Sequence, residues 1–147
     1  MEMPEVIIRP ITVSDVSRII DLEMTYLGET IGSDLLMSEA TNRTIKFLAI
    51  EKRGLLLGYI GCYHVFEECE LLNFVIDGAF QRCGYGQMLF DALLKEVNPK
   101  RVLLEVRVNN QKAINFYLKN GFKQISIRKN YYLDQTDALV MEKLLGD

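Results

Sequence analysis

The sequence has little of several features that mark specialised protein classes. Its 147 residues include no tryptophan, one histidine, three prolines and three cysteines. The cysteines, Cys62, Cys69 and Cys83, form no C-x-x-C pair and are odd in number. Such usage argues against a disulfide framework and against a zinc ribbon, so we expect reduced thiols and no metal site.

Long apolar runs and strongly charged segments are also missing. The longest nearly apolar stretch, residues 55–66, has about twelve residues, whereas a membrane-spanning helix needs about 20. The first five residues are acidic and lack the basic and apolar regions of a secretory signal. The net charge is -3 and the basic residues are scattered, unlike those of nucleic-acid binders. We therefore expect a cytoplasmic protein with no nucleic-acid or membrane partner.

The composition that is present suits an ordinary globular domain. Hydrophobic residues make up 49% of the chain and charged residues 25%. A chain of this size buries roughly 68–70% of its unfolded surface, so it can build a core without disulfides or metals. No repeat or flexible linker interrupts it, which predicts a single domain over residues 1–147.

Hydrophobic periodicity predicts alternating strands and helices. In the first half it predicts a strand at 6–11, a helix after the cap residues 12–15, a second short helix at about 33–42, and an antiparallel meander of strands at 47–50, 55–66 and 71–76. In the second half, an apolar stripe marks a helix that ends at Asn98-Pro99 and comprises Tyr85, Met88, Leu89, Ala92, Leu93 and Val97. After it we expect a strand at 102–108, a helix at 112–120, and strands at 123–128 and 138–144.

A glycine-containing turn, Q-R-C-G-Y-G at residues 81–86, lies between a predicted strand and the start of this striped helix. The free N–H groups of a helix's first turn attract anions, and glycine lets a phosphate approach the backbone. Arg82 could add a phosphate contact. The alternative is that Gly84 and Gly86 only make a tight strand-to-helix turn. The segment matches neither the P-loop nor the dinucleotide fingerprint.

Glu105 stands in the middle of a β-rich run. Period-2 alternation places Val102, Leu104, Val106 and Val108 on one face and Leu103, Glu105 and Arg107 on the other. One interpretation is pairing with Arg107 or exposure on an edge strand. The other is a general base with a tuned pKa.

Two further residues have competing interpretations. Tyr117 shares a helical stripe with Ala113 and Ile114 and, on that pattern alone, reads as core packing. His64 lies in an apolar strand without the spacing of a catalytic triad, so we interpret it as structural. Cys62 and Cys69 read as small buried side chains.

Together these segments resemble the GNAT N-acetyltransferase superfamily, and within it the ribosomal-protein-alanine N-acetyltransferase branch. The resemblance covers roughly residues 71–141. It rests on L-N-F-V-I-D at 72–77, Q-R-C-G-Y-G at 81–86, L-E-V-R at 104–107, N-x-x-A-I-x-x-Y at 110–117, G-F at 121–122, R-K-N-Y-Y at 128–132 and D-A-L-V-M at 137–141.

The resemblance implies an α/β acyl-CoA N-acyltransferase fold, with a mixed, mostly antiparallel sheet of six or seven strands and about four helices. It also implies acetyl-CoA as co-substrate. Its pyrophosphate would bind the turn formed by Arg82, Cys83, Gly84, Tyr85, Gly86 and Gln87. Backbone groups of Phe74, Val75 and Ile76 would hold the pantetheine arm. Asn110 matches a cofactor-contacting asparagine and also suits a helix N-cap.

The resemblance further implies direct acetyl transfer, with Glu105 as general base and Tyr117 as general acid. The expected acceptor is the N-terminal amine of a protein, a ribosomal protein that begins with alanine. Acceptor choice in this branch is attributed to the loop at about 26–36 and the hairpin at 130–137. The first alternative is acetylation of a small amine such as a polyamine, amino acid or aminoglycoside, since one fold hosts many acceptors. The second is a non-catalytic binding module.

Overall fold

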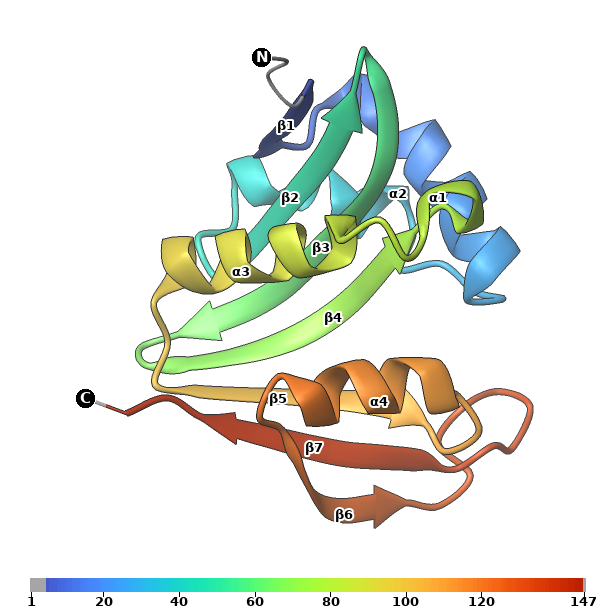
Figure 1. Ribbon diagram of the computed structural model, residues 1–147, viewed down its shortest axis with the longest axis vertical. Helices are drawn as coiled ribbons and strands as arrows, with labels where there is room; N and C mark the ends of the chain where they lie inside the picture. The colour runs from blue at the N-terminus through green and yellow to red at the C-terminus, as the bar shows by residue number, and fades with distance from the viewer. Residues whose placement is uncertain (1–4, 147) are drawn as a thin grey trace. The chain divides into compact units, whose positions relative to one another are not determined.

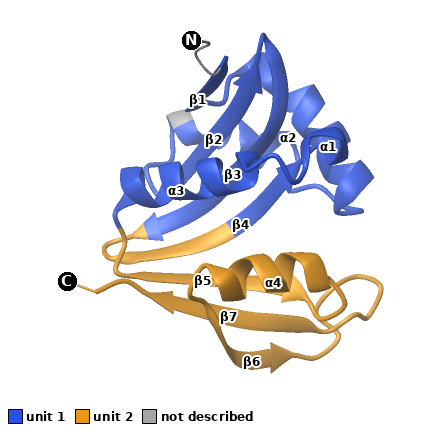
Figure 2. Ribbon diagram, in the orientation of Figure 1, with its two compact units in different colours: residues 1–64, 72–98 blue, residues 65–71, 99–147 orange. Residues whose placement is uncertain are grey.

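The structure is a computed structural model that describes residues 5–146, apart from the side chain of Ala40. The acidic start of the chain at residues 1–4 and residue 147 lie outside this range. The chain divides into two compact units (Figure 2). Unit 1 contains residues up to 64 and residues 72–98, and unit 2 contains residues 65–71 and those from 99 onward.

Unit 1 combines strands with three α-helices (Figure 1). Its strands are β1 (Val6–Pro10), β2 (Ile45–Lys52), β3 (Leu55–Val65) and the second half of β4 (Glu68–Ile76). Its helices are α1 (Val16–Tyr26), α2 (Ser33–Leu36) and α3 (Tyr85–Val97). Strand β2 pairs antiparallel with both β1 and β3.

The core of unit 1 forms where α1 packs on the strands. Residues three and four apart share one face of a helix, so Val16, Ile19 and Leu22 are buried together. They pack against Phe47 of β2 and Tyr59 of β3, whose rings lie 6.1 Å apart. The apolar spacing in α1 therefore places one face of the helix in the core of unit 1.

The buried face of α3 is shifted by one position from the predicted stripe. Leu89, Phe90 and Leu93 are buried, whereas Met88 is 41% exposed. The ring of Phe90 stacks on that of Phe74 in β4, with 6.4 Å between centroids. This stacking turns the helix so that Phe90, rather than Met88, faces the strands.

Unit 2 contains the first half of β4, β5 (Arg101–Arg107), α4 (Gln111–Lys119), β6 (Lys123–Arg128) and β7 (Ala138–Leu144). Strand β4 runs parallel to β5 over three residue pairs, from Glu68↔Arg101 to Glu70↔Leu103. Strand β7 pairs antiparallel with both β5 and β6. The predicted bounds of β6 and β7 are confirmed.

The strands form a seven-stranded sheet in the order β1-β2-β3-β4-β5-β7-β6. Together with four α-helices and the mostly antiparallel pairing, this order confirms the predicted fold class. A single N-acetyltransferase domain over residues 1–147 stays a prediction. Among residues 5–146, none of the helices has the length and apolar content that a membrane span requires.

Several predicted boundaries are wrong, among them the start of β4, which lies at Glu68 rather than at residue 71. The helix expected at 33–42 stops at Leu36, and only a 3-10 turn follows at Ser38–Ala40. The Ser38 hydroxyl donates to the Leu35 carbonyl at 2.6 Å, a local bond that competes with helix continuation. Val108, expected on the buried face of its strand, lies beyond the end of β5 and is 39% exposed.

Asp15 stabilises the entry into α1, and its replacement tests this role. Its carboxylate accepts hydrogen bonds from Arg9 at 2.8 Å and from the Thr12 amide at 2.7 Å. The Arg9 hydrogen bond holds the pKa of Asp15 below its usual value. The resulting stabilisation is present above about pH 4 and is lost as the pH falls through the lower folded pKa. We expect Asp15→Asn to lower the free energy of unfolding at pH 7 by about 1–2 kcal/mol in urea titrations.

Repeating the titrations at falling pH supplies the control. The difference between wild type and Asp15→Asn should shrink once the wild-type carboxyl group is protonated. A constant difference down to pH 2 would contradict an electrostatic role for Asp15.

Candidate active site

The glycine turn before α3 leaves the start of this helix uncapped. Gly84 is the N-cap residue, with φ of 84°, and has no side chain to accept the N–H groups of the first turn. Those groups have no partner within the helix, and the helix dipole adds positive potential there. Arg82 also adopts a left-handed conformation, with φ of 66°. The turn is therefore suited to an anion.

The candidate cofactor residues of β4 lie directly behind this turn. A Cβ placed on Gly86 would be 3.6 Å from Phe74 Cζ and 3.7 Å from Ile76 Cγ1, an ordinary packing distance. The Gln81 side chain donates to the Ile76 carbonyl at 2.9 Å and so joins the turn to the end of the strand. The structure thus brings Phe74, Ile76 and the turn together within unit 1.

Two side chains of α1 hold the first residue after β4. The Asp77 carboxylate accepts from Arg18 at 2.7 Å and from the Tyr26 hydroxyl at 3.0 Å. Its other local bond comes from the Ala79 amide at 3.1 Å. The Arg18 hydrogen bond is the main reason why the pKa of Asp77 lies below its usual value. An ionised Asp77 therefore anchors the segment that leads into the glycine turn.

The side chains of Arg82 and Cys83 are exposed on the turn. Among residues 5–146, no acidic side chain pairs with Arg82. Its guanidinium group is therefore available to a phosphate. Cys62 and Cys69 are buried, as the sequence predicts.

Glu105 lies on the face of β5 opposite to the buried Val102, Leu104 and Val106. Its side chain is 16% exposed and forms an ion pair with Arg128 of β6. The hydroxyl of Tyr131 donates to Glu105 Oε1 at 3.0 Å. The carboxylate is thus partly buried and oriented on both oxygens.

One structural alternative for Glu105, exposure on an edge strand, is wrong, because strand β5 lies between β4 and β7. The guanidinium of Arg107 binds the Asp134 carboxylate at 2.9 Å and lies 4.1 Å from the centre of the Tyr132 ring, whereas Glu105 forms its ion pair with Arg128. The predicted alternation along the strand is confirmed up to Arg107.

Tyr117 of α4 is 8% exposed and packs edge-on against the rings of Phe116 and Phe122, at 5.5 and 5.3 Å. Burial is the main reason why its pKa is raised above the usual value, and nearby Tyr132 adds to the shift. Within the described part of the chain, its hydroxyl makes no side-chain hydrogen bond. The core-packing interpretation holds, and the phenol also remains protonated at neutral pH.

The hairpin between β6 and β7 connects the surroundings of Glu105 and Tyr117. Tyr131 donates a hydrogen bond to Glu105, and Tyr132 contributes to the raised pKa of Tyr117. The rings of Tyr131 and Tyr132 lie 5.0 Å apart. Arg128 and Tyr131 were not among the predicted site residues. The signal that could have identified them is their shared R-K-N-Y-Y segment, which places a cation and two phenols on the hairpin beside the Glu105 strand.

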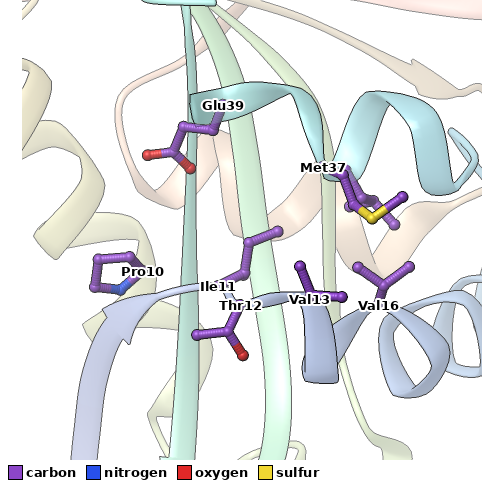
Figure 3. A pocket seen from close by; sticks show the side chains of 8 residues that line it. Pro10, Ile11, Thr12, Val13, Val16, Met37 and Glu39 are labelled. Carbon is purple, nitrogen blue, oxygen red and sulfur yellow. The ribbon is translucent and has the colours of Figure 1, made fainter. Parts of the chain in front are cut away.

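Asn110, His64 and the open cavity lie apart from these contacts. Asn110 is the N-cap of α4, where its side chain accepts from the Ala113 amide at 3.2 Å. His64 is half-buried, and its backbone amide donates to the Thr44 carbonyl. An open cavity of about 350 Å³, lined by residues that include Pro10, Val13 and Met37, contains none of the predicted site residues (Figure 3).

Known proteins are similar to this chain in sequence and in fold. The family model described as "Acetyltransferase (GNAT) family" matches residues 15–122. A Bacillus subtilis relative, provisionally named a [ribosomal protein bS18]-alanine N-acetyltransferase, is 33% identical over 139 residues, which cover 91% of this chain and 92% of the relative. A Salmonella typhimurium [ribosomal protein bS18]-alanine N-acetyltransferase is 40% identical over 83 residues, which cover 52% of this chain and 56% of the relative.

The fold is shared with a solved enzyme. The crystal structure of the ribosomal-protein-S18-alanine N-acetyltransferase from Escherichia coli superposes with a TM-score of 0.85 at 24% identity. The alignment covers 97% of this chain and 95% of that one. The family match extends over most of the chain and includes both the glycine turn and Glu105. The chain therefore belongs to the acetyltransferase (GNAT) family and is an N-acetyltransferase.

Proposed function

We propose that this enzyme transfers acetyl from acetyl-CoA to the N-terminal α-amine of a ribosomal protein that begins with alanine. The observation that carries the chemistry is that unit 2 contains both an oriented carboxylate, Glu105, and a buried, protonated phenol, Tyr117. The names of the relatives support the acceptor. A ribosomal acceptor would also place the reaction in the cytoplasm, as the sequence predicts.

The residues of the glycine turn suit the pyrophosphate of acetyl-CoA. The uncapped amides from Arg82 to Gln87 would donate to it, and the Arg82 side chain would add charge. Backbone groups of Phe74, Val75 and Ile76 would hold the pantetheine arm and polarise the thioester carbonyl. Asn110 would contact the co-substrate in addition to capping α4.

Glu105 would act as the general base. An N-terminal ammonium has no lone pair and cannot attack a thioester, so a proton must leave first, through a water molecule if the base is not in direct contact. A carboxylate offers about four lone-pair positions, of which Arg128 and Tyr131 occupy one on each oxygen. The remaining positions are open to a water or an amine.

Tyr117 would act as the general acid. When the amine has attacked the carbonyl carbon and the C–S bond breaks, the departing thiolate takes the phenolic proton. The raised pKa keeps that proton on Tyr117 at neutral pH. The transfer is direct, and Cys83 carries no acetyl group.

Replacing Gly86 tests the proposed phosphate contact. The site beside Phe74 and Ile76 has room for a methyl group, and alanine favours the helix by roughly 0.5–1 kcal/mol over glycine. A phosphate close to the backbone would nevertheless meet this methyl group. We expect Gly86→Ala to leave thermal stability equal or higher while acetyl-CoA affinity falls at least about tenfold, equal to about 1.4 kcal/mol, in calorimetric titrations.

A second pair of variants separates backbone strain from ligand contact. Gly84 and Gly54 both have left-handed backbones and open space around them, but only Gly84 lies in the glycine turn before α3. Gly84→Ala should weaken acetyl-CoA binding, whereas Gly54→Ala should only lower stability. Unchanged affinity in both Gly84→Ala and Gly86→Ala would place the pyrophosphate elsewhere.

Replacing the proposed base and acid tests the mechanism. We expect Glu105→Gln and Tyr117→Phe each to lower kcat by roughly 10²–10⁴-fold with acetyl-CoA affinity retained, because each removes a proton-transfer group. Steady-state kinetics and equilibrium binding measure the two quantities separately.

Glu142→Gln is a matched control for the base. Glu142 is a carboxylate of unit 2 whose side chain is 12% exposed and which pairs with Arg101 at 2.6 Å. This variant also loses an ion pair but should retain kcat. Equal losses in Glu105→Gln and Glu142→Gln would assign the effect to stability rather than catalysis.

The acceptor is tested by free-thiol release from acetyl-CoA with two amines. One is a basic peptide that begins with alanine, and the other is spermidine. We expect turnover with the peptide and none with the same peptide blocked at its N-terminus. Turnover with spermidine alone would replace the proposed acceptor with a small amine.

A further inference from the structure

Glu23 is a buried carboxylate for which the proposed mechanism has no use. It lies on the inner face of α1 and is 0% exposed. Its oxygens accept hydrogen bonds from three neutral groups: the hydroxyl of Thr30, the hydroxyl of Tyr59 at 2.5 Å and the side-chain amide of Asn73 at 2.7 Å. Four segments of unit 1 therefore meet at one side chain.

Stability alone does not explain this arrangement, because burying the carboxylate of Glu23 costs free energy. Over residues 5–146, no basic side chain pairs with Glu23. A buried carboxylate costs free energy even when it is hydrogen-bonded, and well-packed apolar groups often stabilise such a site equally well or better. A role in positioning other segments explains why a carboxylate occupies a position on the apolar stripe of α1.

One of the segments held by Glu23 is the loop after α1. The Leu27 and Gly28 amides donate to the Glu23 carbonyl at 2.7 and 3.0 Å, and the Thr30 hydroxyl donates to its carboxylate. The same hydroxyl accepts from the Gly32 amide at 2.9 Å. Gly28 and Gly32 both have positive φ angles. Thr30 is thus the central point at which this glycine-flanked loop is fastened to the interior.

The other segment is the strand proposed to hold acetyl-CoA. Asn73, which donates to Glu23, immediately precedes Phe74 on β4. Tyr59 lies on β3 and reaches the carboxylate from the core. Burial and the neighbouring Glu23 charge raise the pKa of Tyr59, so its hydroxyl keeps the donated proton. The carboxylate therefore connects the loop to the strand through side chains alone.

We infer that Glu23 is a positioning residue, which holds the loop at residues 27–32 in the conformation that admits the acceptor peptide while it fixes Asn73 within the acetyl-CoA strand. This inference rests on the proposed function, because it assigns the loop to the acceptor. It predicts that removing the hydrogen bond between Thr30 and Glu23 raises the KM for the peptide. Removing the hydrogen bond between Tyr59 and Glu23 should lower only the stability of the protein.

Thr30→Val tests the inference without a change in the buried charge, which matters because Glu23 variants can fail to fold. Valine has a similar shape but cannot bond to Glu23 or Gly32. We expect the KM for a peptide that begins with alanine to rise about tenfold, because the loop loses a hydrogen bond to a charged group. Both kcat and the KM for acetyl-CoA should stay within about twofold of wild type. Thr30→Ser, which retains the hydroxyl, should restore the peptide KM.

Tyr59→Phe is the matched control, since it also removes one hydrogen bond to Glu23 but does not touch the loop. It should lower the melting temperature and leave the peptide KM unchanged. An unchanged KM in Thr30→Val, or an equal rise in Tyr59→Phe, would overturn the positioning role.

Amide hydrogen exchange supplies a readout that does not need catalysis. Exchange of the amides at residues 27–32 should be faster in Thr30→Val than in wild type, Thr30→Ser or Tyr59→Phe. Faster exchange in a protein that never acetylates the peptide would support the tether while rejecting the proposed acceptor. Equal exchange in all four proteins would reject the tether itself.

Discussion

The constraint on which the candidate site depends is that the backbone at the start of α3 keeps its amide groups uncapped. Most helices satisfy these groups with a serine, threonine, aspartate or asparagine side chain. Here Gly84 occupies the cap position in a left-handed conformation, and Gln81 and Asp77 hold the preceding segment by bonds that leave the first turn open. The helix packs on β4 through Phe90 and Phe74, so the uncapped end is fixed beside the strand.

In unit 2 the corresponding constraint is strand alternation. Burial of Val102, Leu104 and Val106 leaves Glu105 on the opposite face of β5, where a hairpin supplies Arg128 and Tyr131. The same hairpin contains Tyr132, which helps to raise the pKa of the buried phenol of Tyr117. The proposed acid and base chemistry would thus depend on one short connection between β6 and β7.

Local pattern was sufficient to predict most of the elements, whereas the roles of the candidate residues were implied by the resemblance to the GNAT superfamily. Alternation gave the face of Glu105, and the cap residues at 12–15 predicted the start of α1. Partners distant in sequence could not be read in this way. Glu105 pairs with Arg128 of another strand, and Phe90 replaced Met88 on the buried face of α3, because tertiary contacts decide both. The break after Leu36 depended on a side-chain bond of Ser38 that propensity does not show.

The acceptor distinguishes this enzyme from others with the same fold, because one acetyl-CoA site can be combined with many amines. The most direct measurement is tandem mass spectrometry of ribosomal protein bS18 after incubation with the purified enzyme and acetyl-CoA. One acetyl group on the α-amine of the N-terminal alanine, absent when Glu105→Gln replaces the wild-type enzyme, is the expected result. Unmodified bS18, or acetyl groups found only on lysine side chains, would contradict N-terminal transfer.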